Sequence, residues 1–142
     1  MPKMIFVNLP VADVEKSEAV GFTKDLRFSR PGSAAAMVWS DTIVFMILSH
    51  AHFAEFSSKR IVDANSEVET LLCLSIERRE GVDAIVEKAV AAGGKADPGP
   101  KIDHGFMYGR SFQDLDGHVL EPMWIDLESA LAAKGCQHTE AA

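Results

Sequence analysis

Residues 112–121 read Phe112-Gln113-Asp114-Leu115-Asp116-Gly117-His118-Val119-Leu120-Glu121, and this stretch predicts a strand, a tight turn and a second strand. Asp114 and Asp116 can bond to nearby backbone groups, and Gly117 can take the positive φ that such a turn needs. The apolar run 119–125 that follows carries one carboxylate, that of Glu121. A buried carboxylate is costly unless it is paired, hydrogen-bonded or bound to a metal. Glu121 is therefore the residue that a functional hypothesis must explain.

The geometry of this turn decides which residue faces Glu121. A type I turn with a glycine bulge sets Ser111 opposite Glu121. A two-residue turn between Asp114 and Gly117 sets Arg110 there instead, where its guanidinium would neutralise the carboxylate. An Asp-x-Asp-Gly sequence favours the first turn, and the sequence leaves both open.

Composition describes an ordinary soluble protein. The 142 residues suit a single domain spanning 1–142, with a flexible tail from about 134. Hydrophobic residues make up 47% and charged residues 25% of the chain, and neither a membrane span nor a signal peptide is recognisable. Two cysteines, Cys73 and Cys136, do not make a disulfide framework, so we expect free thiols and a cytoplasmic protein.

Net charge narrows the range of partners. The chain carries 14 basic and 21 acidic residues, a formal charge of −7. This balance argues against nucleic acid as a partner, because such binding rests on neutralisation of phosphates by Lys and Arg. It modestly favours cationic ligands.

The remaining pattern predicts alternating strands and helices. Strands are expected over 4–9, 34–39, 42–49, 70–76, 108–113 and 118–125. Asp13 can cap a helix that begins at Val14 and carries Phe22 and Leu26 at helical spacings. An amphipathic helix over 82–90 ends at Gly93-Gly94. Residues 50–67 form a long connection, 98–100 a loop or edge segment, and a short helix follows Asp126.

Three segments together resemble the vicinal oxygen chelate superfamily, which contains glyoxalase I, extradiol dioxygenases, fosfomycin-resistance enzymes and bleomycin-resistance proteins. Besides the Asp-x-Asp-Gly turn and its Glu121, the chain has Leu9-Pro10-Val11-Ala12-Asp13, where the family ends its first strand. It also has Phe22-Thr23-Lys24-Asp25-Leu26-Arg27-Phe28, where the family writes Phe-Tyr-x-x-Leu-Gly-Phe. Thr23 and Arg27 depart from that pattern. The resemblance covers 4–126 and is specific for fold rather than for activity.

The resemblance implies an α+β fold made of two βαβββ modules, about 4–50 and 70–126, whose curved sheets form a trough. Val11 and Ile76 would occupy equivalent places in the two modules. Family members usually dimerise, so we expect a homodimer.

The resemblance also implies a metal site, which this chain does not match. The family's ligand positions fall on Phe6, Met46, Leu71 and Glu121. Only the last can bind a divalent metal well. A register slip of two residues brings in Asn8, Leu48, Glu69 and Cys73, which is still a poor set. We therefore expect no metal and no other cofactor.

The candidate site residues follow from these positions. Glu121 is the candidate catalytic carboxylate, and His104, in the loop before the strand 108–113, a candidate general acid–base. The other histidines, His50, His52, His118 and His138, are read as solvated loop residues. The expected ligand-binding residues of the trough are Phe6, Asn8, Met46, Leu71, Tyr108, Arg110 and Met123.

Three functions are compatible with this pattern. The first is metal-independent binding of a small organic ligand in an apolar trough, as in bleomycin-resistance-type proteins that sequester a cationic drug. The alternative is a glyoxalase-like lyase or isomerase, with Glu121 as base and Arg110, Tyr108 or His104 as the electrophile. The third is a dimeric scaffold without a ligand, in which Arg110 neutralises Glu121.

Overall fold

The first half of the chain forms one four-stranded sheet with a short helix. The computed structural model describes residues 2–17 and 22–138, without the side chains of 135–138. Module 1 comprises β1 (Ile5–Val11), α1 (Val14–Ser17), β2 (Thr23–Arg30), β3 (Ala34–Ser40) and β4 (Ile43–Ser49). The strand order is β1-β4-β3-β2, and β1 runs parallel to β4. The short helix α2 (His50–Phe53) then leads into the connection to the second half.

The second half repeats this topology with broken strands. Module 2 comprises β5 (Leu71–Ser75), α3 (Arg79–Ala91), β6 (Lys95–Ala96), β7 (Ile102–Asp103), β8 (Met107–Gly109), β9 (Phe112–Gln113) and β10 (Val119–Ile125), and α4 (Leu127–His138) follows it. Its first strand β5 again runs parallel to its last strand β10. Pro98 and Pro100 lack an N–H group for a ladder, which accounts for the break between β6 and β7. The predicted α+β fold of paired modules is confirmed.

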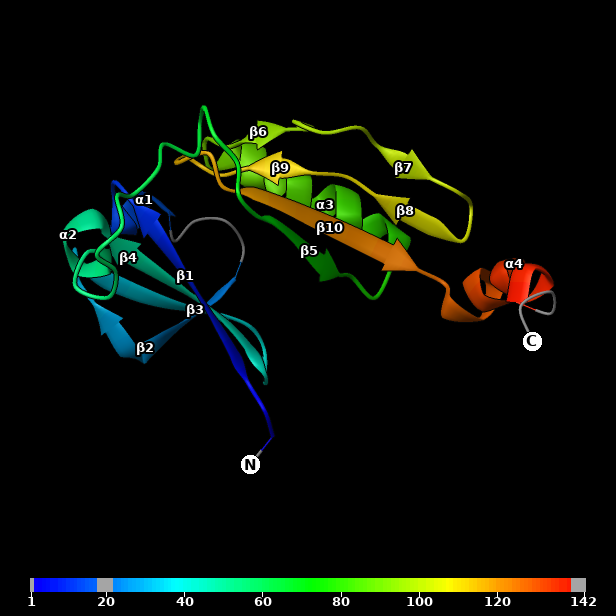
Figure 1. The fold of residues 1–142 in the computed structure, drawn as a ribbon, viewed down its shortest axis with the longest axis horizontal. Coiled ribbons are helices and arrows are strands. Elements are labelled where there is room, and N and C mark those ends of the chain that lie inside the picture. The colour runs from blue at the N-terminus through cyan, green and yellow to red at the C-terminus, as the bar shows by residue number, and fades with distance from the viewer. Residues whose placement is uncertain (1, 18–21, 139–142) are drawn as a thin grey trace.

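The two modules lie side by side and share one apolar core (Figure 1). Module 1 supplies Met37, Phe45 and Ile47 to this core, and module 2 supplies Leu74 and Phe112. The amphipathic helix α3 covers one face of the module 2 sheet through Val82, Val86 and Ala89, which are almost fully buried. The helix α4 extends beyond the end of β10. None of the helices in the described residues is long and apolar enough to span a membrane.

Strand periodicity gives each curved sheet a second face that points away from this core. We call these the open faces. The open face of module 1 carries Phe6, Asn8, Ala36, Val38, Val44 and Met46. The open face of module 2 carries Leu71, Cys73, Glu121 and Met123. These faces of the curved sheets form the half-barrel trough that is typical of the predicted fold.

The predicted hairpin forms with the glycine-bulge turn. The N–H of Asp114 donates to the carbonyl of His118 over 3.0 Å, and Gly117 has a φ of 96°. Gln113 pairs with Val119, and the Arg110 N–H donates to the carbonyl of Pro122. This register sets Ser111 opposite Glu121. The alternative turn, with Arg110 facing Glu121, is wrong.

The same turn joins the two modules. The Asp116 carboxylate accepts the backbone N–H of Ala12 at 2.8 Å and the Ser17 hydroxyl at 3.4 Å. The His118 imidazole Nε2 bonds to the carbonyl oxygen of Pro10 at 2.7 Å. His118 is therefore not the solvated loop residue that the sequence predicted. Its half-buried ring links the last strand of module 2 to the end of β1.

One predicted helix is largely a strand. The helix expected from Val14 through Phe22 and Leu26 ends at Ser17 within the described residues, and 23–30 form β2. The Pro31-Gly32 turn favours a hairpin here, and β3 supplies the partner strand. Phe22 then packs against Trp39 and Phe45, with ring centroids 5.4 and 5.3 Å away. Tertiary pairing has overridden an accidental helical spacing.

Two glycines with positive φ give a matched test of the role of the turn. An added Cβ at Gly117 would lie 2.4 Å from backbone atoms of Ala64 and Asn65, whereas one at Gly105 (φ 80°) would meet nothing within 4 Å. We expect Gly105→Ala to lower the free energy of unfolding by roughly 1 kcal/mol, through backbone strain alone. We expect Gly117→Ala to lower it by at least about 3 kcal/mol, because strain and overlap add. Urea unfolding measures both free energies. Equal losses would mean that the backbone at Ala64 and Asn65 moves aside at no cost.

Candidate functional site

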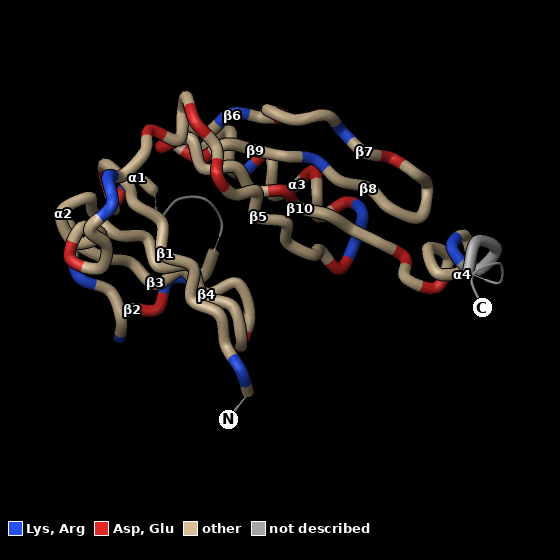
Figure 2. The backbone as a smooth tube through the Cα atoms, in the orientation of Figure 1, with Lys and Arg blue, Asp and Glu red and all other residues tan. Residues whose placement is uncertain are grey.

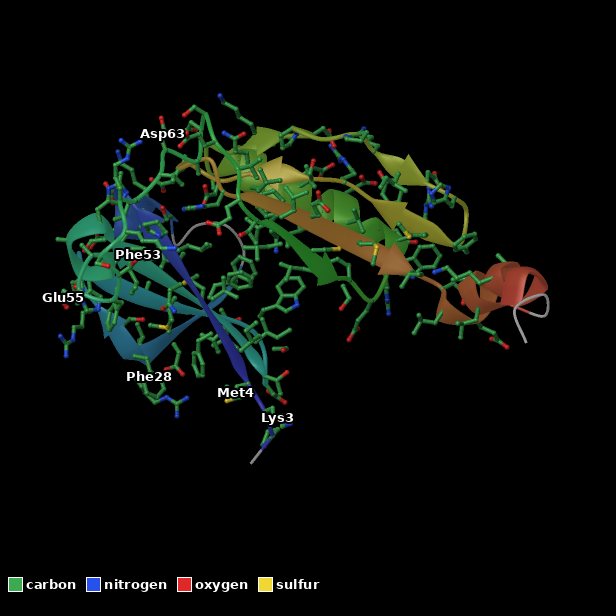
Figure 3. All side chains as sticks on the ribbon, in the orientation of Figure 1. Lys3, Met4, Phe28, Phe53, Glu55 and Asp63 are labelled. Carbon is green, nitrogen blue, oxygen red and sulfur yellow. The ribbon has the colours of Figure 1, made fainter. Side chains whose placement is uncertain are left out.

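The open face of module 1 holds a cavity of about 730 Å³. Its walls come from all four strands of that sheet and are mostly apolar, with Phe6, Val38, Val44 and Met46 among them. Phe6 is 55% exposed and Phe28 65% exposed, which is unusual for aromatic side chains in a small protein. Figure 3 shows Met4, which also lines the cavity, and Phe28 at the same end of module 1.

Two charged groups at this cavity neutralise each other. The Arg27 guanidinium donates to both carboxylate oxygens of Asp25, at 3.0 and 2.7 Å, and lies 5.5 Å from the centre of the Phe28 ring. These hydrogen bonds hold the pKa of Asp25 below its ordinary value. The Asp41 carboxylate lines the same cavity and has no hydrogen bond or ion pair within the described part of the chain. The uncompensated charge at the cavity is therefore negative.

Glu121 lies on the other open face, outside this cavity. Its carboxylate is half-buried on β10, beside Cys73 of β5. Partial burial and the Glu121 charge both raise the pKa of the Cys73 thiol. Among the described residues, no hydrogen bond or ion pair reaches the Glu121 carboxylate. The structure thus groups Phe6, Asn8 and Met46 in one cavity and places Leu71, Glu121 and Met123 on the module 2 sheet.

Arg110 and Tyr108, predicted to line the trough, instead face α3. Arg110 donates from Nε and Nη2 to Asp97, at 3.0 and 2.7 Å, and from Nη1 to Asp83 at 2.9 Å. The Tyr108 hydroxyl donates to the same Asp83 oxygen at 2.7 Å. The Arg110 side chain is only 13% exposed. The structure therefore does not bring these two residues onto the open face, because the bulged turn fixes their strand with its even-numbered side chains toward the helix.

This cluster continues as a chain of charges along α3. Arg79 lies 4.2 Å from the centre of the Tyr108 ring and forms an ion pair with Asp103. The hydrogen bond from Arg79, followed by that from the Gly105 N–H, lowers the pKa of Asp103 to about 2. Hydrogen bonds from Tyr108 and Arg110 lower the pKa of Asp83. The network fixes the β7–β8 hairpin on the helix. No motif signals this network, because its members are spread along the chain from Arg79 to Arg110.

His104 lies at the tip of that hairpin. Its ring is exposed and stacks on Phe106 with centroids 6.1 Å apart. The Phe106 carbonyl accepts the Asp126 N–H just past the end of β10. Ile125 lies four residue steps beyond Glu121 along β10, a span of roughly 13 Å. Glu121 and His104 therefore do not form one catalytic pair within the chain.

The described residues do not fit a divalent metal. Within 2–17 and 22–134, no three His, Cys, Asp or Glu side chains come close enough together to bind one. The family's ligand positions on Phe6, Met46 and Leu71 offer no oxygen or nitrogen donor. Glu121 alone supplies one ligand, whereas a catalytic zinc requires about three. The side chains of Cys136 and His138 lie outside the described residues.

Comparison with solved structures assigns the fold. A hypothetical protein of S. aureus is 27% identical, with a TM-score of 0.69, over 87% of this chain and 94% of that one. A glyoxalase/bleomycin resistance protein/dioxygenase family enzyme from Burkholderia phytofirmans PsJN matches at 18% identity and a TM-score of 0.66, over 88% and 100%. The chain has the vicinal oxygen chelate fold. The fosfomycin resistance protein FosX from Listeria monocytogenes shares this fold at 17% identity and a TM-score of 0.58, over 89% and 93%. No family model and no curated protein matches the sequence.

The Arg110 cluster gives this vicinal oxygen chelate fold a defined response to acid. Hydrogen bonds from Tyr108 and Arg110 lower the pKa of Asp83, and those from Arg110 lower the pKa of Asp97. This pairing therefore stabilises the protein above the ordinary value of 3.8 and is lost as the pH falls below it. We expect Arg110→Met to lower the free energy of unfolding by about 2 kcal/mol at pH 7, because two carboxylates lose their partner.

The difference between wild type and Arg110→Met should therefore shrink as the pH falls from about 5 toward 2. Chemical denaturation across that range measures it. Asp114, whose pKa burial raises, is present in both proteins and cancels from the difference. Arg79→Met, at the more exposed end of the network, serves as a control with a smaller expected loss. A difference that does not change with pH would contradict the assignment.

Proposed function

We propose that this protein binds a small, apolar, cationic organic molecule in the trough without a metal. The observation that carries the proposal is the 730 Å³ cavity, whose apolar walls include two half-exposed phenylalanines. Pockets of about 300–1,000 Å³ with such a lining are typical of sites for small organic molecules. Because Arg27 and Asp25 neutralise each other, Asp41 is the uncompensated charge at the cavity. Both this carboxylate and the net charge of −7 attract a cationic ligand.

Aromatic rings are the expected recognition element. Phe6 and Phe28 line the cavity, and Arg27 already lies over the Phe28 ring. Aromatic rings attract an aromatic or cationic group in addition to the free energy of apolar burial. Met46 offers a polarizable thioether, which adapts to irregular ligands. These features support a binding protein for planar cations more than an enzyme for one small polar substrate.

A glyoxalase-like lyase is less well supported by the geometry. The Glu121 carboxylate has no partner among the described residues and could act as a base, which is the one observation that favours a lyase. Such chemistry also needs an electrophile beside the base. Tyr108 and Arg110 face α3, and His104 lies at the hairpin tip, so none of the three predicted electrophiles is positioned for that role within the chain.

A second copy of the chain is the proposed partner. Within the described residues, β1 and β5 each pair with one strand only and so have an unpaired edge. The open faces also expose Phe6 and Leu71, which is 56% exposed. Exposed apolar faces beside free edges favour association. A homodimer would cover the module 1 cavity and could bring Glu121 of the other copy toward it.

Fluorescence titration with 9-aminoacridine, a planar aromatic cation, tests the ligand proposal. We expect binding that EDTA leaves unchanged and that Phe6→Ala weakens about tenfold, since a lost phenylalanine contact costs 1.5–3 kcal/mol. Asp41→Asn should weaken binding of the cation a few-fold, but it should not weaken binding of 2-naphthoate, an anionic aromatic control that the Asp41 charge repels. Phe56→Ala removes an aromatic side chain that is 72% exposed outside the cavity and serves as the matched control. Equal affinity for the anion, loss with EDTA, or hemithioacetal turnover abolished by Glu121→Gln would each count against the proposal.

Light scattering coupled to size-exclusion chromatography tests the homodimer. We expect a mass near twice the 15.4 kDa of one chain. Leu71→Asp places a charge on the open face of module 2 and should shift the mass to that of the monomer. Val90→Asp places the same charge on the outer side of α3, at a residue 45% exposed, and should leave the dimer intact. A monomeric wild type at micromolar concentration would refute this part.

A further inference from the structure

A second cavity, of about 350 Å³, lies where the two modules meet. Three parts of the chain surround it: the ends of β1 and α2 in module 1, the turn and strand starts of module 2, and the connection between the modules. Figure 3 labels Phe53 and Asp63 along the path of this connection from module 1 toward module 2. We call this space the seam cavity. It adjoins the trough at Asn8, which lines both cavities.

The connection that closes the seam cavity is unusually long for a loop without secondary structure. It runs from residue 54 to residue 70, and loops beyond about 12–15 residues are uncommon in compact domains unless they are functional or disordered. Here it is held in place: Ala64 and Asn65 lie directly on Gly117, and the Gln113 side chain donates to that of Asn65 at 3.1 Å. The turn that joins the modules therefore also fixes the roof of the cavity.

The chemistry of the seam cavity differs from that of the trough. Its floor is apolar, with Leu9, Phe53 and Leu72. Its walls carry charges of both signs on two separate segments of the connection: Lys59 and Arg60 on one, Glu67 and Glu69 on the other. Figure 2 shows both basic and acidic residues in each of the two modules.

None of these four charged side chains has an ion pair within the described residues. The backbone N–H and C=O groups of residues 60–62 also have no hydrogen bond in that part of the chain. These two cationic and two anionic side chains are exposed and unpaired, and they line the cavity together with apolar residues. Such a lining is complementary to a ligand that carries both charges beside an apolar group. A volume near the lower end of the usual range restricts that ligand to a small one.

We propose that the seam cavity binds a small zwitterion of the class of the apolar amino acids. The apolar side chain would rest on the floor, the carboxylate would bond to Lys59 and Arg60, and the ammonium group would bond to Glu67 and Glu69. Because the cavity is built from both modules, the bound molecule holds them together and raises the stability of the chain. This site is independent of the trough ligand proposed above.

Isothermal titration calorimetry with L-leucine and L-phenylalanine tests the inference directly. We expect both to bind, and we expect leucinamide and N-acetyl-leucine, which each keep one charge, to bind at least tenfold more weakly. Arg60→Gln and Glu69→Gln should each reduce leucine affinity, and both lie on exposed loop positions where folding is not at risk. Equal affinity for the singly charged derivatives would show that the site does not recognise the ammonium and carboxylate groups together.

A matched pair of tryptophan variants locates the site. Val62, which lines the cavity, is 48% exposed, and Val90, on α3 outside it, is 45% exposed. Val62→Trp should fill the cavity and abolish leucine binding, whereas Val90→Trp should leave it unchanged. Both should retain 9-aminoacridine binding, which separates this site from the trough. No heat with either amino acid at millimolar concentration, undiminished binding to Val62→Trp, or displacement of leucine by 9-aminoacridine would overturn the inference.

Discussion

The arrangement of this molecule depends on the hydrogen bonds of one turn. The backbone of residues 114–118 must curl back with Gly117 at positive φ, and this frees the Asp116 carboxylate and the His118 ring to bond to the end of β1. A carboxylate that accepts a backbone N–H forms a charge-assisted hydrogen bond, stronger than a neutral one. The apolar core holds the two modules together, and the hydrogen bonds of the turn fix their relative orientation.

The same turn sets which side chains of module 2 face the trough. Since side chains alternate along a strand, the bulge at Gly117 sends Arg110 and Tyr108 toward α3 and leaves Glu121 and Met123 on the open face. A turn shorter by one residue would have put Arg110 on the same face as Glu121. The ionic cluster on α3 and the lack of a polar partner for the Glu121 carboxylate among the described residues are therefore two consequences of one backbone geometry.

The two cavities reflect different ways of making space in a small protein. The trough exists because a curved sheet has one face covered by core and another left open, so its lining follows strand periodicity and is apolar. The seam cavity exists because a long connection arches over the junction of two modules, so its lining is drawn from loop residues and carries charge. Each lining favours a different ligand chemistry, although the two spaces meet at Asn8.

The sequence by itself determined the local elements and the fold. Alternating apolar residues and the Asp-x-Asp-Gly turn predicted strands and a hairpin, and the resemblance to the vicinal oxygen chelate superfamily implied paired βαβββ modules. The spacing of Phe6 and Asn8 on one strand was enough to place them on one face. It failed where partners are distant in the chain: β2 needs β3 to exist as a strand, and Arg110 needs Asp83 and Asp97.

Only the tertiary structure decided which candidates share a site. It separated the trough residues of module 1 from Glu121, turned Tyr108 and Arg110 onto α3, and put His118 at the junction of the modules. It also created the seam cavity. No sequence motif predicts this cavity, because the loop residues that line it follow no periodic pattern. Periodicity reports which face a side chain takes, whereas the meeting of two faces depends on packing between segments far apart in sequence.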